Sequence, residues 1–325
     1  MRPSASPIAV WIGLVVLYFV WGSTYIGIKV AVETIPAFVM GFLRFVPAGI
    51  LLAGTVALVN RRTIRRPSRR EVVDASIVGT CLLLGGMGLV AWGEQTIPSG
   101  IAALLVALMP MWLAILGLAF FGERLPRAGV VGIAVGLLGV AILAWPTAGV
   151  DDLDPAGLLA LLVSPVLWAL GSIYAARRAV LPAPALFATG AEMVAGGIAL
   201  LIASALTGEL ASFDVAAVSP QSWAGLLYLL VVGSLVGYTT FAWLLTVAPL
   251  QRVATYAYVN PVVAVILGAI ILQEPLTPRT VVASVVIVAA VVLIVTARGR
   301  VAPRVVAVPA GSADGAEPGS EPAAA

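Results

Sequence analysis

Long stretches without any charged residue constrain the fold of this chain more than any other feature. Residues without Asp, Glu, Lys or Arg form the runs 8–28, 75–93, 95–122, 128–150, 155–176, 215–251, 253–273 and 280–297. Two more stretches, 36–59 and 179–208, contain a single charge each. Because a helix needs roughly 20 apolar residues to cross the hydrocarbon of a bilayer, the pattern predicts ten membrane-spanning helices.

The composition excludes the other common architectures. Of the 325 residues, 61% are hydrophobic and only 10% are charged, whereas soluble domains have about 25% charged residues. A transmembrane barrel alternates polar and apolar residues over about ten positions and does not contain such uniform runs. The sequence therefore predicts an all-α polytopic membrane protein.

Ten spans distribute the positive charges unequally between the two sides of the membrane. One side receives fifteen of the eighteen Lys and Arg residues, namely Arg2, Arg61, Arg62, Arg65, Arg66, Arg69, Arg70, Arg124, Arg127, Arg177, Arg178, Arg252, Arg298, Arg300 and Arg304. The other side receives Lys29 and Arg279, and Arg44 lies inside a span. Short cytoplasmic loops attract Lys and Arg, so we expect both termini in the cytoplasm.

The basic stretch 61–70 has two interpretations, an anionic-lipid contact that sets topology or a nucleic-acid patch. It contains no interleaved aromatic residue and lies between two spans, which favours the lipid bilayer as its partner and argues against nucleic acid. Residues 301–325 are rich in Ala, Pro, Gly and Glu, a composition typical of disorder. They are predicted to form a disordered cytoplasmic tail.

Four short motifs occur twice, in the same order and 148 to 151 positions apart. They are Gly22-Ser23-Thr24-Tyr25 with Gly171-Ser172-Ile173-Tyr174; Val46, Gly49 and Ile50 with Val194, Gly197 and Ile198; Ala91-Trp92 with Ala242-Trp243; and Pro110, Gly117, Glu123 and Leu125 with Pro261, Gly268, Glu274 and Leu276. Each match is weak alone, but four in one order indicate an internal repeat. We predict one five-helix repeat over 1–150 and a second over 151–300.

An odd number of spans per repeat makes the second copy enter the membrane from the opposite side. Inverted repeats of this kind are the architecture of many secondary transporters. Their binding site lies near the midplane between the halves, and access alternates as one half moves against the other. The pattern therefore favours a carrier for small molecules.

Three segments carry a resemblance to a known family. They are Trp21-Gly22-Ser23-Thr24-Tyr25, the run from Ile97 to Ala103, and the run from Ala254 to Val263, which reads ATYAYVNPVV. The chain resembles, over nearly its whole length apart from the tail, the EamA-type members of the drug/metabolite transporter superfamily. The resemblance implies a ten-helix inner-membrane exporter of amino acids, other metabolites or drug-like compounds, and it does not name the substrate.

Two charged residues lie deep within predicted spans, Arg44 and Glu192. The offset that aligns Val46 with Val194 also aligns these two, so they occupy equivalent positions in the halves. Ionisable groups inside the hydrocarbon are costly and are functional candidates by default. Both are expected near the midplane, either binding a polar or zwitterionic substrate or forming a structural ion pair. Glu192 is also the candidate for proton coupling.

Prolines inside spans are the next candidates. Pro110 and Pro261 are matched across the repeat and are predicted to break their helices, because proline removes a backbone hydrogen bond. Pro47 and Pro165 also fall inside spans. Interrupted helices in corresponding positions of two halves point to a transporter site, although kinked membrane helices are common for other reasons.

Aromatic and amide side chains supply the remaining candidates for substrate binding. Tyr256 and Asn260 are four residues apart and share a helix face, which suggests either a polar lining or contacts between helices. Trp21 and Tyr25 are spaced in the same way. Trp92 and Trp243 are matched across the repeat, so they are candidates for the cavity rather than only for anchoring at the membrane surface.

Glu94 follows the third span, where the sequence favours a solvated side chain over a gate residue. The glycines 129, 132, 136 and 139 form one stripe of the fifth span. Small residues permit close helix contact, so the stripe either packs internally or forms the seam of a homodimer. The pattern does not separate the two.

Rival functions fit the sequence less well. An intramembrane enzyme lacks its chemistry here: there is no histidine, no pair of buried Asp residues and no phosphate-binding glycine loop. We therefore predict no catalytic residue, metal site or cofactor. A channel is the other alternative, and the absence of a ring of like residues disfavours it. Seventeen arginines against one lysine suggest a GC-rich bacterial genome and thus the bacterial inner (plasma) membrane.

Overall fold

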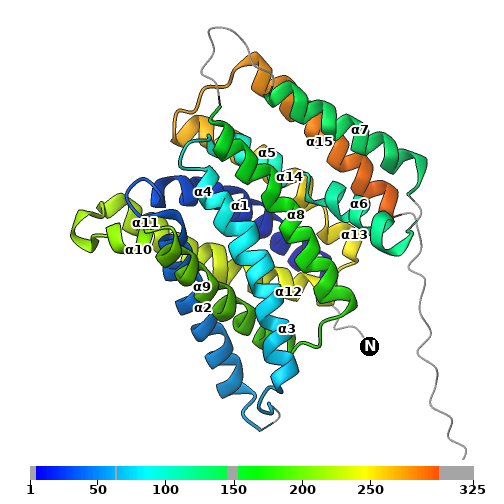
Figure 1. The fold of residues 1–325 in the computed structure, drawn as a ribbon. Helices are drawn as coiled ribbons and strands as arrows, with labels where there is room; N and C mark the ends of the chain where they lie inside the picture. Colours follow the sequence, from blue (N-terminus) through cyan, green and yellow to red (C-terminus); the bar gives the residue numbers. More distant parts are fainter. Residues whose placement is uncertain (1–4, 63, 124, 145–152, 300–325) are drawn as a thin grey trace, which may run out of the picture.

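The computed structural model describes residues 5–62, 64–123, 125–144 and 153–299, and the predicted tail 301–325 lies outside them. Over these residues the protein is helical and contains no strand. Nine helical segments are long and apolar enough to cross a membrane, and Tyr256–Ile271 is a shorter apolar helix that makes the tenth crossing. The prediction of an all-helical membrane protein with ten spans is confirmed (Figure 1).

The first five crossings begin at Pro7 and end at Ala144. They are α1 (Pro7–Ala31), α2 (Ala37–Val59), α3 (Arg69–Gly79) continued by the π-helix η1 (Thr80–Gly88) and α4 (Leu89–Gly93), α5 (Ser99–Val106) followed by α6 (Met109–Phe121), and α7 (Arg127–Ala144). The third crossing begins six residues before the charge-free run 75–93. Ser68 and Glu71 form a capping box there, which satisfies backbone N–H groups of the first turn.

The last five crossings begin at Pro155. They are α8 (Pro155–Arg177), α9 (Ala185–Leu206), α11 (Pro220–Tyr228) continued by the π-helix η3 (Leu229–Val236) and α12 (Gly237–Val247), α13 (Leu250–Val253) followed by α14 (Tyr256–Ile271), and α15 (Pro278–Gly299). Between α9 and α11 lie the short helix α10 (Glu209–Ser212) and the 3₁₀-helix η2 (Val215–Ala217).

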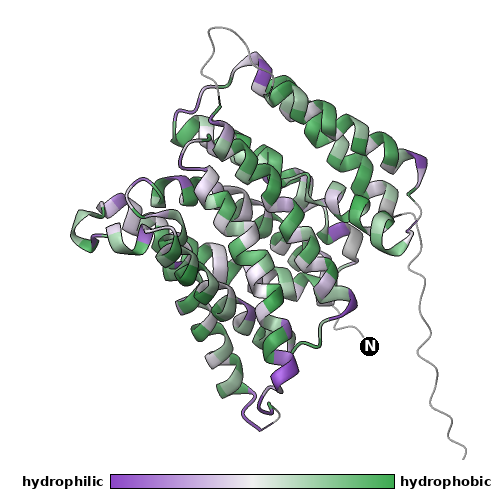
Figure 2. Ribbon diagram, in the orientation of Figure 1, coloured by the Kyte–Doolittle hydropathy of each residue, from purple (hydrophilic) through white to green (hydrophobic). Residues whose placement is uncertain are grey.

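The bundle has two ends that differ in charge. The arginine-rich end holds Arg61, Arg62, Arg65, Arg66, Arg69, Arg70, Arg127, Arg177, Arg178 and Arg252. The opposite end holds the connections 32–36, 94–98, 207–219 and 272–277. Figure 2 shows hydrophilic colour gathered at helix ends and in connections, with hydrophobic colour along the helices between them.

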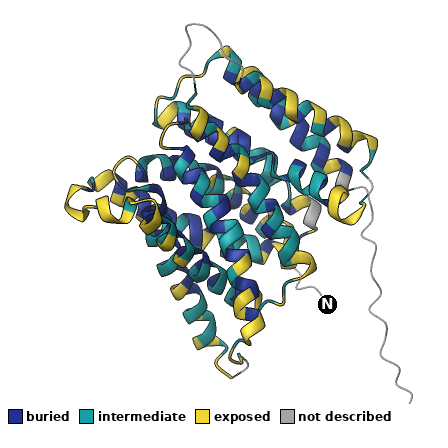
Figure 3. Cartoon of the chain, viewed as in Figure 1, coloured by how far each residue is buried: buried dark blue, intermediate teal, exposed yellow. Residues whose placement is uncertain are grey.

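Two pairs of helices pack closely. The glycine stripe of α7 lies against α15: a Cβ added at Gly132 would lie 2.7 Å from Ile294, and one added at Gly139 would lie 2.5 Å from Ile287. The stripe therefore packs internally, and the outer faces of α7 and α15 carry the exposed positions (Figures 1 and 3). Likewise, a Cβ at Gly49 of α2 would lie 2.7 Å from the carbonyl oxygen of Gly190 on α9.

The two π-helical segments were not foreseen. Thr80–Gly88 and Leu229–Val236 begin 149 positions apart, the spacing of the sequence repeat. The first packs on α8 and α9, and the second packs on α1 and α2. Because π-helices are rare and occur often at functional sites, two in matched positions make these segments candidates for a functional role.

The prolines do not all break their helices. Pro110 is the second residue of α6, directly after the break that separates α5 from α6. In the ninth crossing the break between α13 and α14 precedes Pro261, which lies inside α14. Pro47 and Pro165 lie inside the continuous helices α2 and α8. An interior proline removes one backbone hydrogen bond, yet α2, α8 and α14 continue through these positions.

Candidate functional site

Aromatic side chains from three helices meet in the bundle. The ring of Trp21 on α1 lies 5.7 Å from Tyr238 and 5.1 Å from Phe241, both on α12, and 5.1 Å from Tyr256 on α14. The rings of Phe241 and Tyr256 are 5.8 Å apart and nearly perpendicular. This aromatic cluster (Trp21, Tyr238, Phe241 and Tyr256) joins one helix of the first half to two of the second.

Arg44 on α2 is the buried cation beside this cluster, with only 2% of its surface exposed. Its Nε donates to the Ser234 hydroxyl at 3.0 Å, and its guanidinium carbon lies 4.6 Å from the ring centre of Phe45. Its two Nη atoms have no acceptor among the residues that the structure describes. A Cβ at Gly233 would lie 3.2 Å from Nη2, so the absence of a side chain on η3 leaves room for the guanidinium.

Glu192 lies on α9, the helix that packs along α2, and its side chain is half-buried. The three ion pairs in the described part of the chain do not include Glu192 or Arg44. Tyr238 lies within electrostatic reach of both. The two predicted charges thus approach one tyrosine, and the direct ion pair is not formed in this conformation.

Tyr25 and Asn260 extend the site toward α1 and α14. Tyr25 lies within electrostatic reach of Glu94 and Tyr256. Asn260 is 8% exposed, and its Oδ1 has no hydrogen-bond partner among the described residues. A Cβ at Gly22 would lie 3.2 Å from the Asn260 carbonyl oxygen, so α1 and α14 are close here. Six of the eight predicted binding residues therefore lie on the helices that surround Tyr238.

The matched tryptophans lie in different surroundings. Trp92 at the end of α4 packs against buried residues of two hydrophobic clusters. Trp243 on α12 is 38% exposed, and its ring packs over Gly13 of α1. Their equivalence in sequence therefore does not carry over into equivalent positions, and only Trp92 lies in the interior.

Glu94 is the acidic residue whose surroundings differ most from the expected ones. The side chain is 0% exposed, and neither carboxylate oxygen has a hydrogen-bond partner among the described residues. The expectation of a solvated side chain was wrong: Glu94 is enclosed, whereas the next two residues, Gln95 and Thr96, are exposed. Lys29 stabilises the connection after α4 by donating from Nζ to the carbonyl oxygens of Glu94, Gln95 and Ile97, at 2.6, 3.5 and 3.1 Å.

Glu274 ties the two halves together at the same end of the bundle. Its Oε1 accepts from the backbone N–H of Ser99 at 2.7 Å, and its Oε2 accepts from that of Gly100 at 3.1 Å. α5 begins after a proline and has no side-chain cap of its own. A carboxylate from the other half therefore satisfies donors that a helix start leaves unpaired and favours the positive end of the helix dipole.

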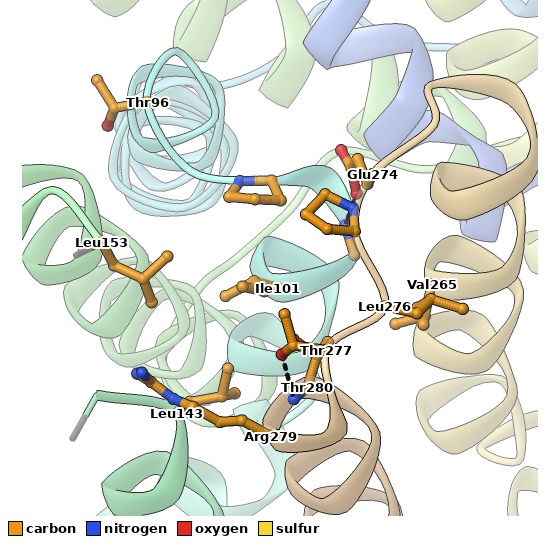
Figure 4. A pocket seen from close by; sticks show the side chains of 13 residues that line it. Thr96, Ile101, Leu143, Leu153, Val265, Glu274, Leu276, Thr277, Arg279 and Thr280 are labelled. Carbon is orange, nitrogen blue, oxygen red and sulfur yellow. Dashed lines mark hydrogen bonds between the residues drawn. The ribbon is translucent and has the colours of Figure 1, made fainter. Parts of the chain in front are cut away.

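Beside Glu274 lies a cavity of about 570 Å³. It is lined by residues of the connection 94–98 and α5, the end of α7, and the connection between α14 and α15. Figure 4 shows Glu274, Thr96 and Arg279 around it. None of the eight predicted binding residues lines this cavity. Within the described residues, no group of three His, Cys, Asp or Glu side chains is arranged to hold a metal ion.

Comparison with known proteins agrees with this architecture. The EamA-like transporter family matches residues 8–145 and again residues 155–296. The chain belongs to this family. Each of the two matched regions of this EamA carrier covers five of the crossings described above.

Relatives of this EamA carrier have transporter names. YedA, an uncharacterized inner membrane transporter of Escherichia coli K12, is 37% identical over 86% of this chain and 89% of its own length. A probable terminal-alkyne amino-acid exporter of Streptantibioticus cattleyicolor is 27% identical over 88% and 93%. A solved crystal structure with 19% identity has a TM-score of 0.60 over 91% of this chain and 99% of that one, which shows the shared fold. The protein is a multi-pass inner membrane secondary transporter.

Proposed function

We propose that this carrier exports small amino-acid-like metabolites, with Arg44 binding the substrate carboxylate and the aromatic cluster packing on its apolar part. The supporting observation is the state of Arg44, whose guanidinium is buried while both Nη atoms have no acceptor in the described protein. An unpaired buried cation is costly. A carboxylate can accept two parallel hydrogen bonds from those atoms, so a substrate carrying one would complete the site.

The relatives support the same class of substrate. One of them is named as a probable exporter of a terminal-alkyne amino acid, which combines a carboxylate, an ammonium group and a short apolar chain. The site offers a cation, aromatic faces and the free Oδ1 of Asn260. We propose that such a substrate crosses by alternating access between the two halves, with no chemical conversion, from the arginine-rich side outward.

Transport into inside-out membrane vesicles tests this function. The probes are propargylglycine, which is a terminal-alkyne amino acid, and but-3-ynylamine, which lacks its carboxylate. We expect Arg44→Gln to reduce propargylglycine uptake at least tenfold, because about 1.4 kcal/mol of lost interaction corresponds to a factor of ten. Arg44→Lys keeps the charge but lacks the planar fork, so we expect only partial recovery.

Arg178→Gln is the matched control, since Arg178 is exposed, and its uptake should equal that of the unmodified protein. If the unmodified protein does not take up propargylglycine, the proposed substrate class is wrong. If Arg44→Gln transports propargylglycine normally at equal protein levels, Arg44 does not bind the carboxylate. Saturation and counterflow of the probe separate a carrier from a channel.

Labelling by an impermeant maleimide tests the orientation of the termini. In a Cys81→Ser background, Arg178→Cys should react only in inside-out vesicles and Glu33→Cys only in intact spheroplasts. Both positions are exposed and lie at opposite ends of the bundle. The reverse pattern would contradict a cytoplasmic arginine-rich end.

A further inference from the structure

Glu94 is a carboxylic acid in an unusual position. It directly follows α4, its side chain is 0% exposed, and both carboxylate oxygens are enclosed without a partner among the described residues. A buried ionised carboxylate that is neither paired nor hydrogen-bonded carries a desolvation penalty of several kcal/mol. The position is therefore compatible with a neutral carboxyl group and strongly unfavourable for a charged one.

Charged and titratable neighbours face Glu94 from three other elements, and none of them bonds its carboxylate. From α1, Tyr25 and Lys29 are within electrostatic reach, as are Arg44 from α2 and Glu274 from the connection before α15. The hydrogen bonds of the last three go elsewhere: Lys29 donates to three backbone carbonyls, Arg44 donates to Ser234, and Glu274 accepts from Ser99 and Gly100.

We propose that Glu94 is the proton-binding site through which this carrier couples export to the proton gradient. The inference rests on the proposed function. A proton on the Glu94 carboxyl group favours closure of the end of the bundle opposite the arginine-rich end, because the buried group is then neutral. When that end is open, the group is hydrated and takes a proton from the outside. When the arginine-rich end is open, the proton leaves to the cytoplasm.

Closure without a proton requires another neutralising partner. The ammonium group of an amino-acid substrate supplies one, since it places a positive charge beside the carboxylate. Each passage between the two open states therefore carries either a proton inward or a substrate outward, with the carboxyl group neutralised in both cases, so one proton is exchanged for one zwitterionic substrate. An empty, deprotonated carrier does not close, which prevents the gradient from leaking.

Glu192 is less suited to this role. Its side chain is half-buried, and it is not among the enclosed groups without a partner. The Glu192 side chain is therefore less completely enclosed than that of Glu94. Complete burial thus distinguishes Glu94 from Glu192. Glu94 is therefore the carboxyl group whose charge would oppose closure.

The transport experiment uses full-length protein in liposomes that contain a pH indicator, with propargylglycine as probe. We expect a pH gradient to drive its accumulation and a matching proton flux in the unmodified protein. Glu94→Gln, which is neutral in every state, should lose gradient-driven accumulation and the matching proton flux at least tenfold, and any probe exchange that remains should no longer depend on the pH gradient. Glu33→Gln is the control, because Glu33 is exposed at the same end, and it should behave as unmodified protein.

An infrared experiment tests protonation without any substrate. The purified protein at neutral pH should show the carbonyl band of a protonated carboxyl group, which Glu94→Gln removes and Glu94→Asp shifts. Glu94→Asp keeps an acid if the Gln variant folds poorly. A spectrum in which neither variant changes this band overturns the proposal, as does gradient-driven accumulation that persists in Glu94→Gln. If the carbonyl band is present and depends on Glu94 but the protein does not transport propargylglycine, Glu94 is protonated as proposed. In that case the proposed substrate class is wrong.

Discussion

The two ends of the bundle use their charged residues differently. At the arginine-rich end, three carboxylates pair with arginine side chains: Glu71 with Arg65, Asp74 with Arg70, and Glu123 with Arg177. The arginines of these pairs are 49–71% exposed. Asp74 also accepts from the backbone N–H of Val180 at 2.7 Å.

At the opposite end, charged side chains bind backbone groups of other helices. Glu274 accepts from the start of α5, and Glu209 accepts from the N–H of Phe38 at 2.8 Å at the start of α2. Lys29 donates to three carbonyls of the connection after α4. Exposed ion pairs contribute about 0–1 kcal/mol, whereas hydrogen bonds to charged groups contribute about 1.5–3 kcal/mol. The exposed pairs of the arginines therefore contribute little stability, and each of the few charges at the other end contributes more by joining neighbouring elements.

The largest effect is expected at Lys29. Lys29→Met keeps the length of the side chain and removes all three hydrogen bonds to the connection that carries Glu94. We expect the free energy of unfolding to fall by about 2–3 kcal/mol, measured by denaturation in detergent micelles. Arg178→Gln, which removes an exposed cation, serves as control. Equal loss in the two variants would remove the distinction between the ends.

Glu274→Gln should favour opening of the opposite end. The neutral amide loses the charge-assisted bonds to Ser99 and Gly100, at a cost of about 1–2 kcal/mol. In a Cys81→Ser background, we expect labelling of Ile101→Cys, which lines the adjacent cavity, to become about tenfold faster with an impermeant maleimide. Unchanged labelling would mean that this contact does not control access.

Arg177→Gln tests the arginine-rich end. Arg177 pairs with Glu123, and its guanidinium lies 4.7 Å from the ring centre of Phe121. Because the side chain is 49% exposed, we expect a loss of stability below about 1 kcal/mol and unchanged labelling at Ile101→Cys. A loss as large as that of Lys29→Met would show that this end is also held by charge.

The smallest effect is a dependence of stability on pH at Asp154. The backbone N–H of Gly157 and the Thr96 hydroxyl hold the pKa of the Asp154 carboxyl below its ordinary value. A depressed pKa in the folded state means that the stabilisation is present above the unfolded pKa and is lost as pH falls through the folded one. The melting temperature of Asp154→Asn should therefore be lower than that of unmodified protein at neutral pH, and the difference should vanish in acid.

Much of the architecture follows from the sequence, because charge-free runs and proline positions act locally. The ten crossings and the burial of Arg44 need no knowledge of tertiary contacts. The hydrogen bonds of Glu274 and Glu209 join residues 170 or more positions apart, and no local pattern encodes them. Glu94 was misjudged for the same reason: the charged groups near its side chain, Lys29, Arg44 and Glu274, come from other elements. The repeat predicted equal roles for Trp92 and Trp243, but neighbouring helices determine what each contacts.

The π-helical segments have a consequence for how these spans tolerate insertions and deletions. A π turn contains one residue more than an α turn, and each residue of an α-helix turns the chain by roughly 100°. Deleting one residue within Thr80–Gly88 would let the segment become α-helical while rotating α3 relative to Trp92 and Glu94. The span would still cross the membrane, yet the acid would leave its enclosed position. The extra residue therefore fixes the rotation of α3 relative to α4. In the same way, the extra residue in Leu229–Val236 fixes the rotation of α11 relative to α12, which carries Tyr238.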